Sequence, residues 1–133
     1  MPSFSPKNIL IDTHIFIWLL FEDYKLTPIA RAAIEQAEQV SISVISLWEL
    51  AIKFSAQKFP YAPDVLAEGL KMLAIVELPI RPSHLMTLPT IELPHKDPFD
   101  ALLIAQAQSE QVYFLTADKT ILQSNYQTID ASR

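Results

Sequence analysis

The chain has 133 residues, half of them hydrophobic and 19% charged, a length and composition typical of a globular protein with a sizeable core. It has no cysteine, which excludes disulfides and thiolate metal sites, and its one glycine, Gly69, excludes glycine-rich loops that cradle nucleotide phosphates. The formal charge of −5 argues against a protein that holds nucleic acid by a broad basic surface. Because the chain also lacks a long apolar run and a signal-peptide pattern, we expect a soluble cytoplasmic protein with no membrane segment.

Strands and helices are predicted to alternate along the chain. In order, the first half gives a strand at 7–12, helices at 13–21 and 27–39, a strand at 40–44 and a helix at 46–58. The second half gives a helix at 64–74, a strand at 75–80, a short helix and proline-rich loop at 82–94, a helix at 97–107, a strand at 111–118, a short helix at 119–124 and a weak strand at 126–131. Such alternation predicts an α/β sandwich with a mostly parallel central sheet.

The segment "HKDPFDALLIAQA" at 95–107 places two aspartates at the start of a predicted helix. Asp97 suits the N-cap, Pro98 the first helical position, and Asp100 the positive end of the helix dipole. Helix capping alone could therefore explain this motif. Evidence for a role in binding has to come from other segments of the chain.

Three further acids stand at informative positions. Asp12 ends the first predicted strand and Asp118 the fourth, and the carboxyl ends of parallel strands meet at one edge of a sheet. Glu49 lies in a helix rich in apolar residues, where a carboxylate needs a partner. Each has a structural alternative, because Asp12 and Asp118 suit helix caps and Lys53 stands four residues after Glu49.

If these acids and Asp100 converge, two carboxylates about 4 Å apart repel by roughly 4 kcal/mol at an effective dielectric of 20, and a divalent cation would offset that repulsion. The three histidines, His14, His84 and His95, show no zinc-ligand spacing, so oxygen ligands and a hard cation such as Mg²⁺ or Mn²⁺ are expected. Acids gathered on such ions activate water for displacement at phosphorus. The expected reaction is phosphodiester hydrolysis.

Four ordered segments carry a family resemblance. "LIDTHIFIWLL", "ISLWELAIK", "HKDPFDALLIAQA" and "LTADKTIL" resemble the PIN-domain family, and most closely its VapC-type toxins. The likeness runs from about Lys7 to Asp130, so we expect one PIN-like domain over residues 1–133. The family fold is a three-layer sandwich, a mostly parallel sheet flanked by helices.

The resemblance implies a metal-dependent endoribonuclease, the toxin of a toxin–antitoxin pair, with RNA as substrate and Mg²⁺ or Mn²⁺ as cofactor. By motif position, the catalytic and metal-binding acids would be Asp12, Glu49, Asp100 and Asp118. Asp97, Thr13 and Thr116 would support them from outside the metal's ligands, although cap and turn roles explain the same residues. A cognate antitoxin and a homodimer are the partners that the family implies.

One departure qualifies this resemblance. Many such toxins carry arginine directly after the second acid of "DPFD", where this chain has Ala101. Positive charge near the site could instead come from four other side chains, namely Lys53, His95, Lys96 and Lys119.

Two alternatives of other classes stay open at this point. One is a catalytically weak or silent PIN-like module that binds a partner or RNA, which the absent arginine would permit. The other is an acidic α/β phosphotransfer protein, although the phosphatase pattern needs a second aspartate two residues after the first, where this chain has His14. Trp18 and Trp48 stand at helical spacing and are expected in the core, with a dimer or antitoxin surface as the alternative.

Overall fold

The computed structural model of the chain describes residues 5–94 and 97–133. Its sheet has the strand order β3-β2-β1-β4-β5, and every pairing between neighbouring strands is parallel. The strands are β1 (Ser5–Ile11), β2 (Gln39–Ser43), β3 (Val76–Leu78), β4 (Val112–Thr116) and β5 (Thr128–Asp130). Parallel strands need crossover connections, and the helices that follow the strands supply them.

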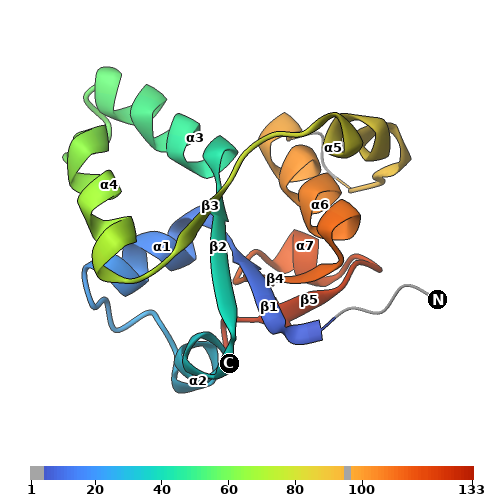
Figure 1. Ribbon diagram of the computed structural model, residues 1–133, viewed down its shortest axis with the longest axis horizontal. Helices are drawn as coiled ribbons and strands as arrows, with labels where there is room; N and C mark the ends of the chain where they lie inside the picture. The colour runs from blue at the N-terminus through green and yellow to red at the C-terminus, as the bar shows by residue number, and fades with distance from the viewer. Residues whose placement is uncertain (1–4, 95–96) are drawn as a thin grey trace.

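Helices cover both faces of this sheet (Figure 1). They are α1 (Thr13–Leu20), α2 (Pro28–Gln36), α3 (Val44–Ser55), α4 (Pro63–Met72), α5 (Pro82–Thr87), the 3-10 turn η1 (Leu88–Thr90), α6 (Pro98–Glu110) and α7 (Lys119–Leu122). The predicted α/β sandwich with a parallel central sheet is confirmed. Among the described residues, no helix is both long and apolar enough to cross a membrane.

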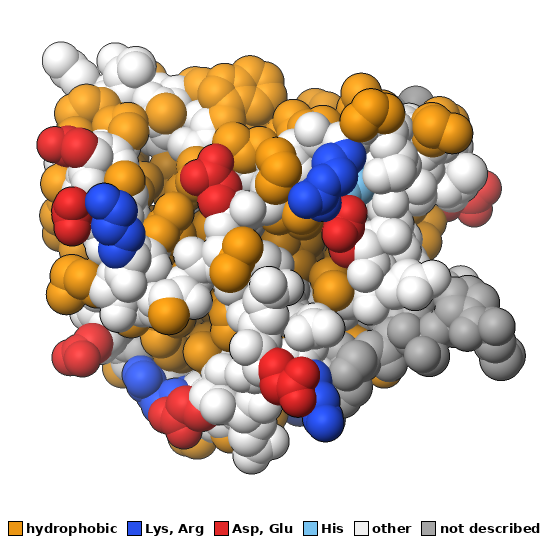
Figure 2. All heavy atoms as spheres, viewed as in Figure 1, with side chains coloured by type: hydrophobic (Ala, Val, Ile, Leu, Met, Phe, Trp, Pro, Cys, Tyr) orange, Lys and Arg blue, Asp and Glu red, His pale blue; other side chains and the backbone are white. Residues whose placement is uncertain are grey.

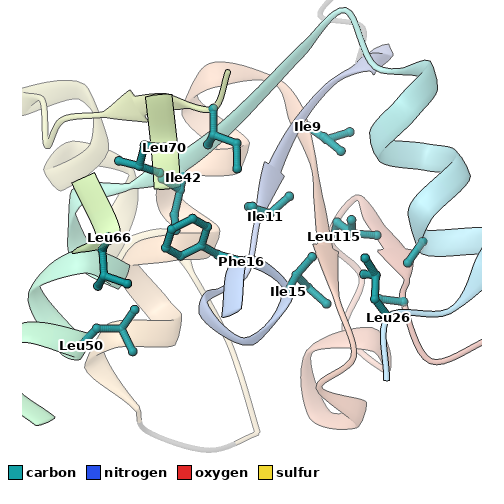
Figure 3. Close-up of a cluster of buried hydrophobic side chains, with 13 residues drawn as sticks. Ile9, Ile11, Ile15, Phe16, Leu26, Ile42, Leu50, Leu66, Leu70 and Leu115 are labelled. Carbon is teal, nitrogen blue, oxygen red and sulfur yellow. The ribbon is translucent and has the colours of Figure 1, made fainter. Parts of the chain in front are cut away.

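The core lies in two layers because side chains alternate along the strands. In β1, Ile9 and Ile11 join a cluster with α1, α2 and α4, whereas Leu10 joins a second cluster with α6 and α7. Figure 3 shows the first cluster, in which the Phe16 ring lies among aliphatic side chains from α4 and the sheet. Burial of strands on both faces explains why they appear in the sequence as short continuous apolar runs.

The predicted element boundaries differ from the observed ones mainly at helix ends. Val44, placed in a strand by the sequence, is the first residue of α3, because the Ser43 hydroxyl accepts a hydrogen bond from Ile45 N–H and caps the helix there. The helix predicted over 27–39 ends at Gln36, and β2 begins at Gln39. Its predicted N-cap is confirmed, since the Thr27 hydroxyl accepts from Ala30 N–H.

The two tryptophans differ in burial. Trp18 is half-buried and packs against the first core cluster, as expected. The core position predicted for Trp48 is wrong, since 56% of its surface is exposed beside the Phe99 ring, with ring centroids 5.2 Å apart. Helical spacing fixes which side of α3 carries Trp48, but the neighbouring helix α6 covers only part of that side.

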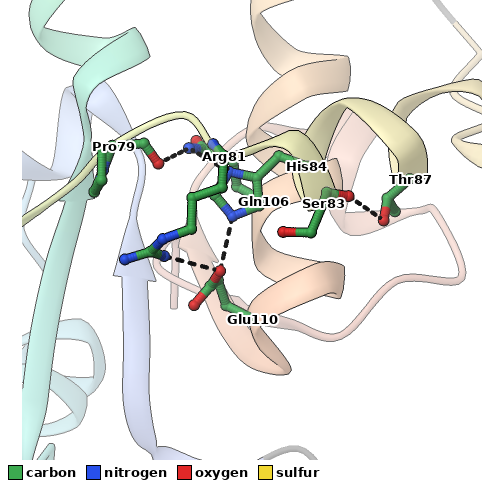
Figure 4. A network of polar contacts seen from close by, with 7 residues as sticks. All are labelled: Pro79, Arg81, Ser83, His84, Thr87, Gln106 and Glu110. Carbon is green, nitrogen blue, oxygen red and sulfur yellow. Dashed lines mark hydrogen bonds and ion pairs between the residues drawn. The ribbon is translucent and has the colours of Figure 1, made fainter.

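A buried polar cluster joins α5 to α6 (Figure 4). His84 is fully buried, and its Nδ1 accepts a hydrogen bond from Arg81 N–H. That ring nitrogen therefore carries no proton, so Nε2 donates to Glu110 Oε2, 2.8 Å away. The Gln106 amide nitrogen donates to the Pro79 carbonyl in the same cluster. The cluster fixes α5 against the second half of α6.

On the face shown in Figure 2, basic side chains of the described residues lie beside acidic ones, and further acidic side chains stand alone. Arg81 lies 3.1 Å from Glu110, and Lys71 lies 3.9 Å from Glu68. Such exposed pairs contribute little to stability. Among the residues that the structure describes, the basic side chains in Figure 2 are dispersed and form no patch, in line with the acidic net charge.

Candidate active site

The ends of β1 and β4 bring two of the predicted acids together. Ile11 pairs with Leu115 in the parallel register, and Asp12 N–H continues the ladder by donating to the Leu115 carbonyl at 3.0 Å. Asp12 follows β1 directly, and Asp118 comes two residues after β4. Both therefore lie at the carboxyl edge of the sheet, where ligands bind in open α/β folds.

A pocket of about 360 Å³ opens at this edge. It is lined by Asp12, Thr13, His14, Trp18, Glu49, Asp97, Asp100, Ala117 and Asp118. All four predicted catalytic acids are in this list, together with two of the three predicted supporting residues. The third, Thr116, is fully buried and contacts Asp12 from below the pocket.

Asp12 is the most deeply placed of the acids, with 9% of its surface exposed. Its Oδ1 accepts from Thr13 N–H at 2.7 Å, and its Oδ2 accepts from the Thr116 hydroxyl at 2.6 Å. Burial raises the pKa of Asp12 from its ordinary value of 3.8 to about 6, with a smaller upward contribution from the nearby charge of Asp100 and against the opposing effect of the two hydrogen bonds. An uncompensated negative charge at this position is therefore costly.

Glu49 is held by a short chain of hydroxyl groups. The Thr13 hydroxyl lies 3.2 Å from Glu49 Oε1 and 2.8 Å from the Ser46 hydroxyl, and Ser46 is fully buried. Since a hydroxyl has one proton, Thr13 donates to Glu49 and accepts from Ser46. Sequence reasoning missed Ser46, and the available signal was its place three residues before Glu49, on the same face of α3.

Lys53 also contacts Glu49, so the ion pair that the sequence offered as an alternative role for Glu49 is present. Its Nζ lies 3.6 Å from Oε2 of Glu49, and both side chains are partly exposed. A helical pair of this kind stabilises by about 0.2–0.5 kcal/mol. Glu49 thus both pairs with Lys53 and lines the pocket. The pair is too weak to explain by itself why a glutamate stands at this position.

The capping roles of the other acids are observed as well. Asp97 Oδ1 accepts from Phe99 N–H at 2.9 Å and Asp100 N–H at 3.3 Å, so Asp97 is the N-cap of α6. Asp118 Oδ1 accepts from Thr120 N–H and caps α7. Because a carboxylate has a second oxygen and further lone pairs, capping leaves Asp118 and Asp97 able to face the pocket.

The donor set of the pocket fits a hard divalent cation, since carboxylate and hydroxyl oxygens are the ligands that Mg²⁺ and Mn²⁺ prefer. A cation bound here would neutralise the negative charge of the buried Asp12 and of the nearby Asp100. Within residues 5–94 and 97–133, however, no three His, Asp or Glu side chains are gathered closely enough to hold one ion together as they stand. A cation would have to draw these side chains inward.

Basic side chains contribute little to the described pocket. Lys53 is paired with Glu49, Lys119 is exposed on α7, and His95 and Lys96 lie outside the described residues. Ala101 is half-buried and lines a separate groove that shares Asp97 with the acidic pocket.

Comparison with known proteins identifies the family to which this arrangement belongs. Residues 9–125 match the sequence model of the PIN domain. The chain belongs to the PIN domain family. This PIN domain protein is also 30% identical over 119 residues to Ribonuclease VapC22 of Mycobacterium tuberculosis, an alignment that covers 86% of this chain and 89% of the relative.

Solved structures agree in fold with this PIN domain protein. A toxin-antitoxin complex from Klebsiella pneumoniae superposes with a TM-score of 0.68 at 20% identity, covering 92% of this chain and 97% of that one. DNA-bound VapBC from Salmonella typhimurium gives a TM-score of 0.68 at 18% identity, with the same coverage. At these identities the likeness establishes the fold of the family.

Proposed function

We propose that this PIN domain protein is a metal-dependent endoribonuclease and the toxin of a toxin–antitoxin pair. The observation that carries the proposal is the meeting of Asp12, Glu49, Asp100 and Asp118 in one pocket, although they come from four separate segments of the chain. The relative named a ribonuclease, which aligns over most of this chain, supports the same activity.

The chemistry follows from the charge of the pocket. An RNA phosphodiester is an anion and would be repelled by these carboxylates unless cations neutralised them. Asp12, Glu49, Asp100 and Asp118 are the residues proposed to hold Mg²⁺ or Mn²⁺, which would supply Lewis-acid activation of water and of the phosphate.

The residues around the acids would keep this site in shape. Thr116 and Thr13 N–H orient the carboxylate of Asp12, and the Thr13 hydroxyl orients Glu49. Asp97 would act from outside the metal's ligands by fixing the first turn of α6, which carries Asp100.

The proposed partners are an RNA substrate, an antitoxin protein and a second copy of the chain. The toxin-antitoxin complexes of the same fold support the antitoxin, whereas the homodimer rests on the resemblance seen in the sequence and the cytoplasmic location on the sequence pattern of the chain. Sedimentation of the purified chain tests the homodimer, and sedimentation after mixing with a candidate antitoxin tests the complex.

Calorimetric titration of Mn²⁺ into the wild type and Asp100→Asn tests the metal site, with melting scans in parallel. We expect the wild type to bind Mn²⁺ and to melt at a higher temperature with it, as linkage requires, and the Asp100→Asn variant to show neither effect. Glu35→Gln is the matched control, because Glu35 is an exposed acid on α2 that does not line the pocket.

Incubation of the same proteins with total cellular RNA and Mn²⁺ then tests the reaction. Cleavage by the wild type and Glu35→Gln, and none by Asp100→Asn, is the expected result. Mn²⁺ binding without cleavage of any RNA would favour the silent binding module. Such a module would retain the acids as a surface that binds basic residues of a partner. Equal behaviour of Asp100→Asn and wild type in both experiments would reduce Asp100 to helix chemistry and overturn the proposal.

A further inference from the structure

One wall of the acidic pocket is aromatic. His14 and Trp18 both line it, and they stand four residues apart on α1, so their side chains lie on the same face of that helix. The ring centroids are 6.2 Å apart and the planes are inclined at 43°. The two rings are therefore tilted, and neither covers a face of the other.

The neighbours of these rings leave them free to accept a ligand. His14 is exposed, whereas Trp18 is half-buried and packs against the core through part of its ring. Among the described residues, neither side chain makes a hydrogen bond, although His14 lies close enough to Asp12 to interact with its charge. Packing holds Trp18 in place, so little conformational entropy would be lost when another ring stacks on it.

We propose that His14 and Trp18 form a stacking platform for a base of single-stranded RNA next to the phosphate that the acids engage. This inference rests on the ribonuclease function proposed above and names how the substrate is held. An aromatic wall directly beside phosphate-directed acids matches a nucleotide, whose base and phosphate are joined through one sugar. Aromatic rings bind unpaired bases by stacking, and every base offers such a face.

Stacking would also provide attraction for RNA in a pocket whose carboxylates repel phosphate. The pocket is lined by five carboxylate side chains, and its one ionisable basic residue among the described lining is His14. The described lining of the pocket therefore has no lysine or arginine to contact the phosphate, a contact that is the usual source of affinity for nucleic acid. Base stacking supplies attraction that does not depend on a basic surface.

Fluorescence of Trp18 tests the platform directly. The chain has two tryptophans, so Trp48→Phe leaves Trp18 as the only indole. The probes are a short oligo(U) with hydrolysis-resistant phosphorothioate linkages and an abasic oligomer with the same backbone, each in Mn²⁺. We expect oligo(U) to quench the fluorescence of Trp18 and to bind more tightly than the abasic oligomer.

Substitutions then separate stacking from packing. Trp18→Leu keeps apolar bulk against the core, removes the aromatic face and is expected to weaken oligo(U) binding about tenfold, while Trp18→Phe keeps most of the affinity. His14→Ala is expected to weaken binding severalfold, and His14→Phe to restore it. None of these changes should alter binding of the abasic oligomer.

The outcomes distinguish the platform from the nuclease function. If the wild type cleaves cellular RNA but Trp18 is not quenched, or if abasic and oligo(U) binding fall together in Trp18→Leu and His14→Ala, the platform is wrong and the nuclease stands. If the wild type neither cleaves RNA nor binds either oligomer, both proposals are wrong.

Discussion

The hydroxyl of Thr116 joins Asp12 to the segment that follows β4. It donates to Asp12 Oδ2 at 2.6 Å and accepts from Asp118 N–H at 3.0 Å. One buried side chain thus sets the positions of two acids that belong to opposite ends of the sequence. The pocket owes part of its shape to this single hydroxyl.

Removal of that hydroxyl is expected to destabilise the protein and to lower its activity. Thr116→Val keeps the volume but leaves Asp12 Oδ2 and Asp118 N–H without a partner, at a cost of about 1–3 kcal/mol. Thr116→Ser retains the hydroxyl and should stay close to the wild type. Urea unfolding at neutral pH and cleavage of RNA in Mn²⁺ measure the two effects. Equal stability of the Val and Ser variants would contradict the role of the hydrogen bonds.

Asp12 is expected to make the stability of the metal-free protein fall as the pH rises. Its folded pKa of about 6 lies above its ordinary value of 3.8, so the folded state binds more protons than the unfolded state between these values. The stability from this group is complete below about pH 4 and is lost as the pH passes 6, by about 3 kcal/mol in total.

The Asp12→Asn variant tests this sign. It should lose the contribution of Asp12 to the pH dependence and be more stable than the wild type at pH 7.5 in EDTA, since asparagine has no charge to bury. Urea unfolding at pH 4.5 and pH 7.5 gives the free energies for both proteins. Parallel pH dependence in the two would show that Asp12 ionises in the fold as it does in water.

Asp97 and Asp100 are expected to separate capping from metal binding. Asp97→Ser keeps a cap for α6 and should change neither stability nor Mn²⁺ affinity much, whereas Asp97→Ala should cost about 1 kcal/mol. Asp100→Asn should abolish Mn²⁺ binding while the protein stays folded. The reverse order of Mn²⁺ affinities, with Asp97→Ser impaired and Asp100→Asn intact, would overturn the assignment of the two residues.

Glu110 is expected to stabilise the fold through His84 more than through Arg81. Glu110→Ala leaves the buried Nε2–H of His84 without its acceptor, which costs about 1–3 kcal/mol. Glu110→Gln keeps an acceptor oxygen and should lose less, and Arg81→Ala removes only a partly exposed pair. Chemical unfolding of the three variants ranks these effects, and a larger loss in Arg81→Ala than in Glu110→Ala would contradict the prediction.

Local patterns in the sequence were sufficient for the elements and for the positions of the acids along them. Short apolar runs between helical segments predict a parallel sheet, and Asp12 and Asp118 stand where β1 and β4 end. The caps at Asp97 and Thr27 follow from residues within three positions of them. These features depend on neighbours in the chain, so their signals lie in the sequence itself.

Only the tertiary structure decided which side chains fix the acids in place. The bond from Thr116 to Asp12 spans 104 residues, that from Thr13 to Ser46 spans 33, and the buried contact of His84 spans 26. Trp48 likewise owes its exposure to how much of α3 the helix α6 covers. Hydrogen bonds and burial between distant segments depend on how the layers pack, and periodicity along one element carries no information about its neighbour in space.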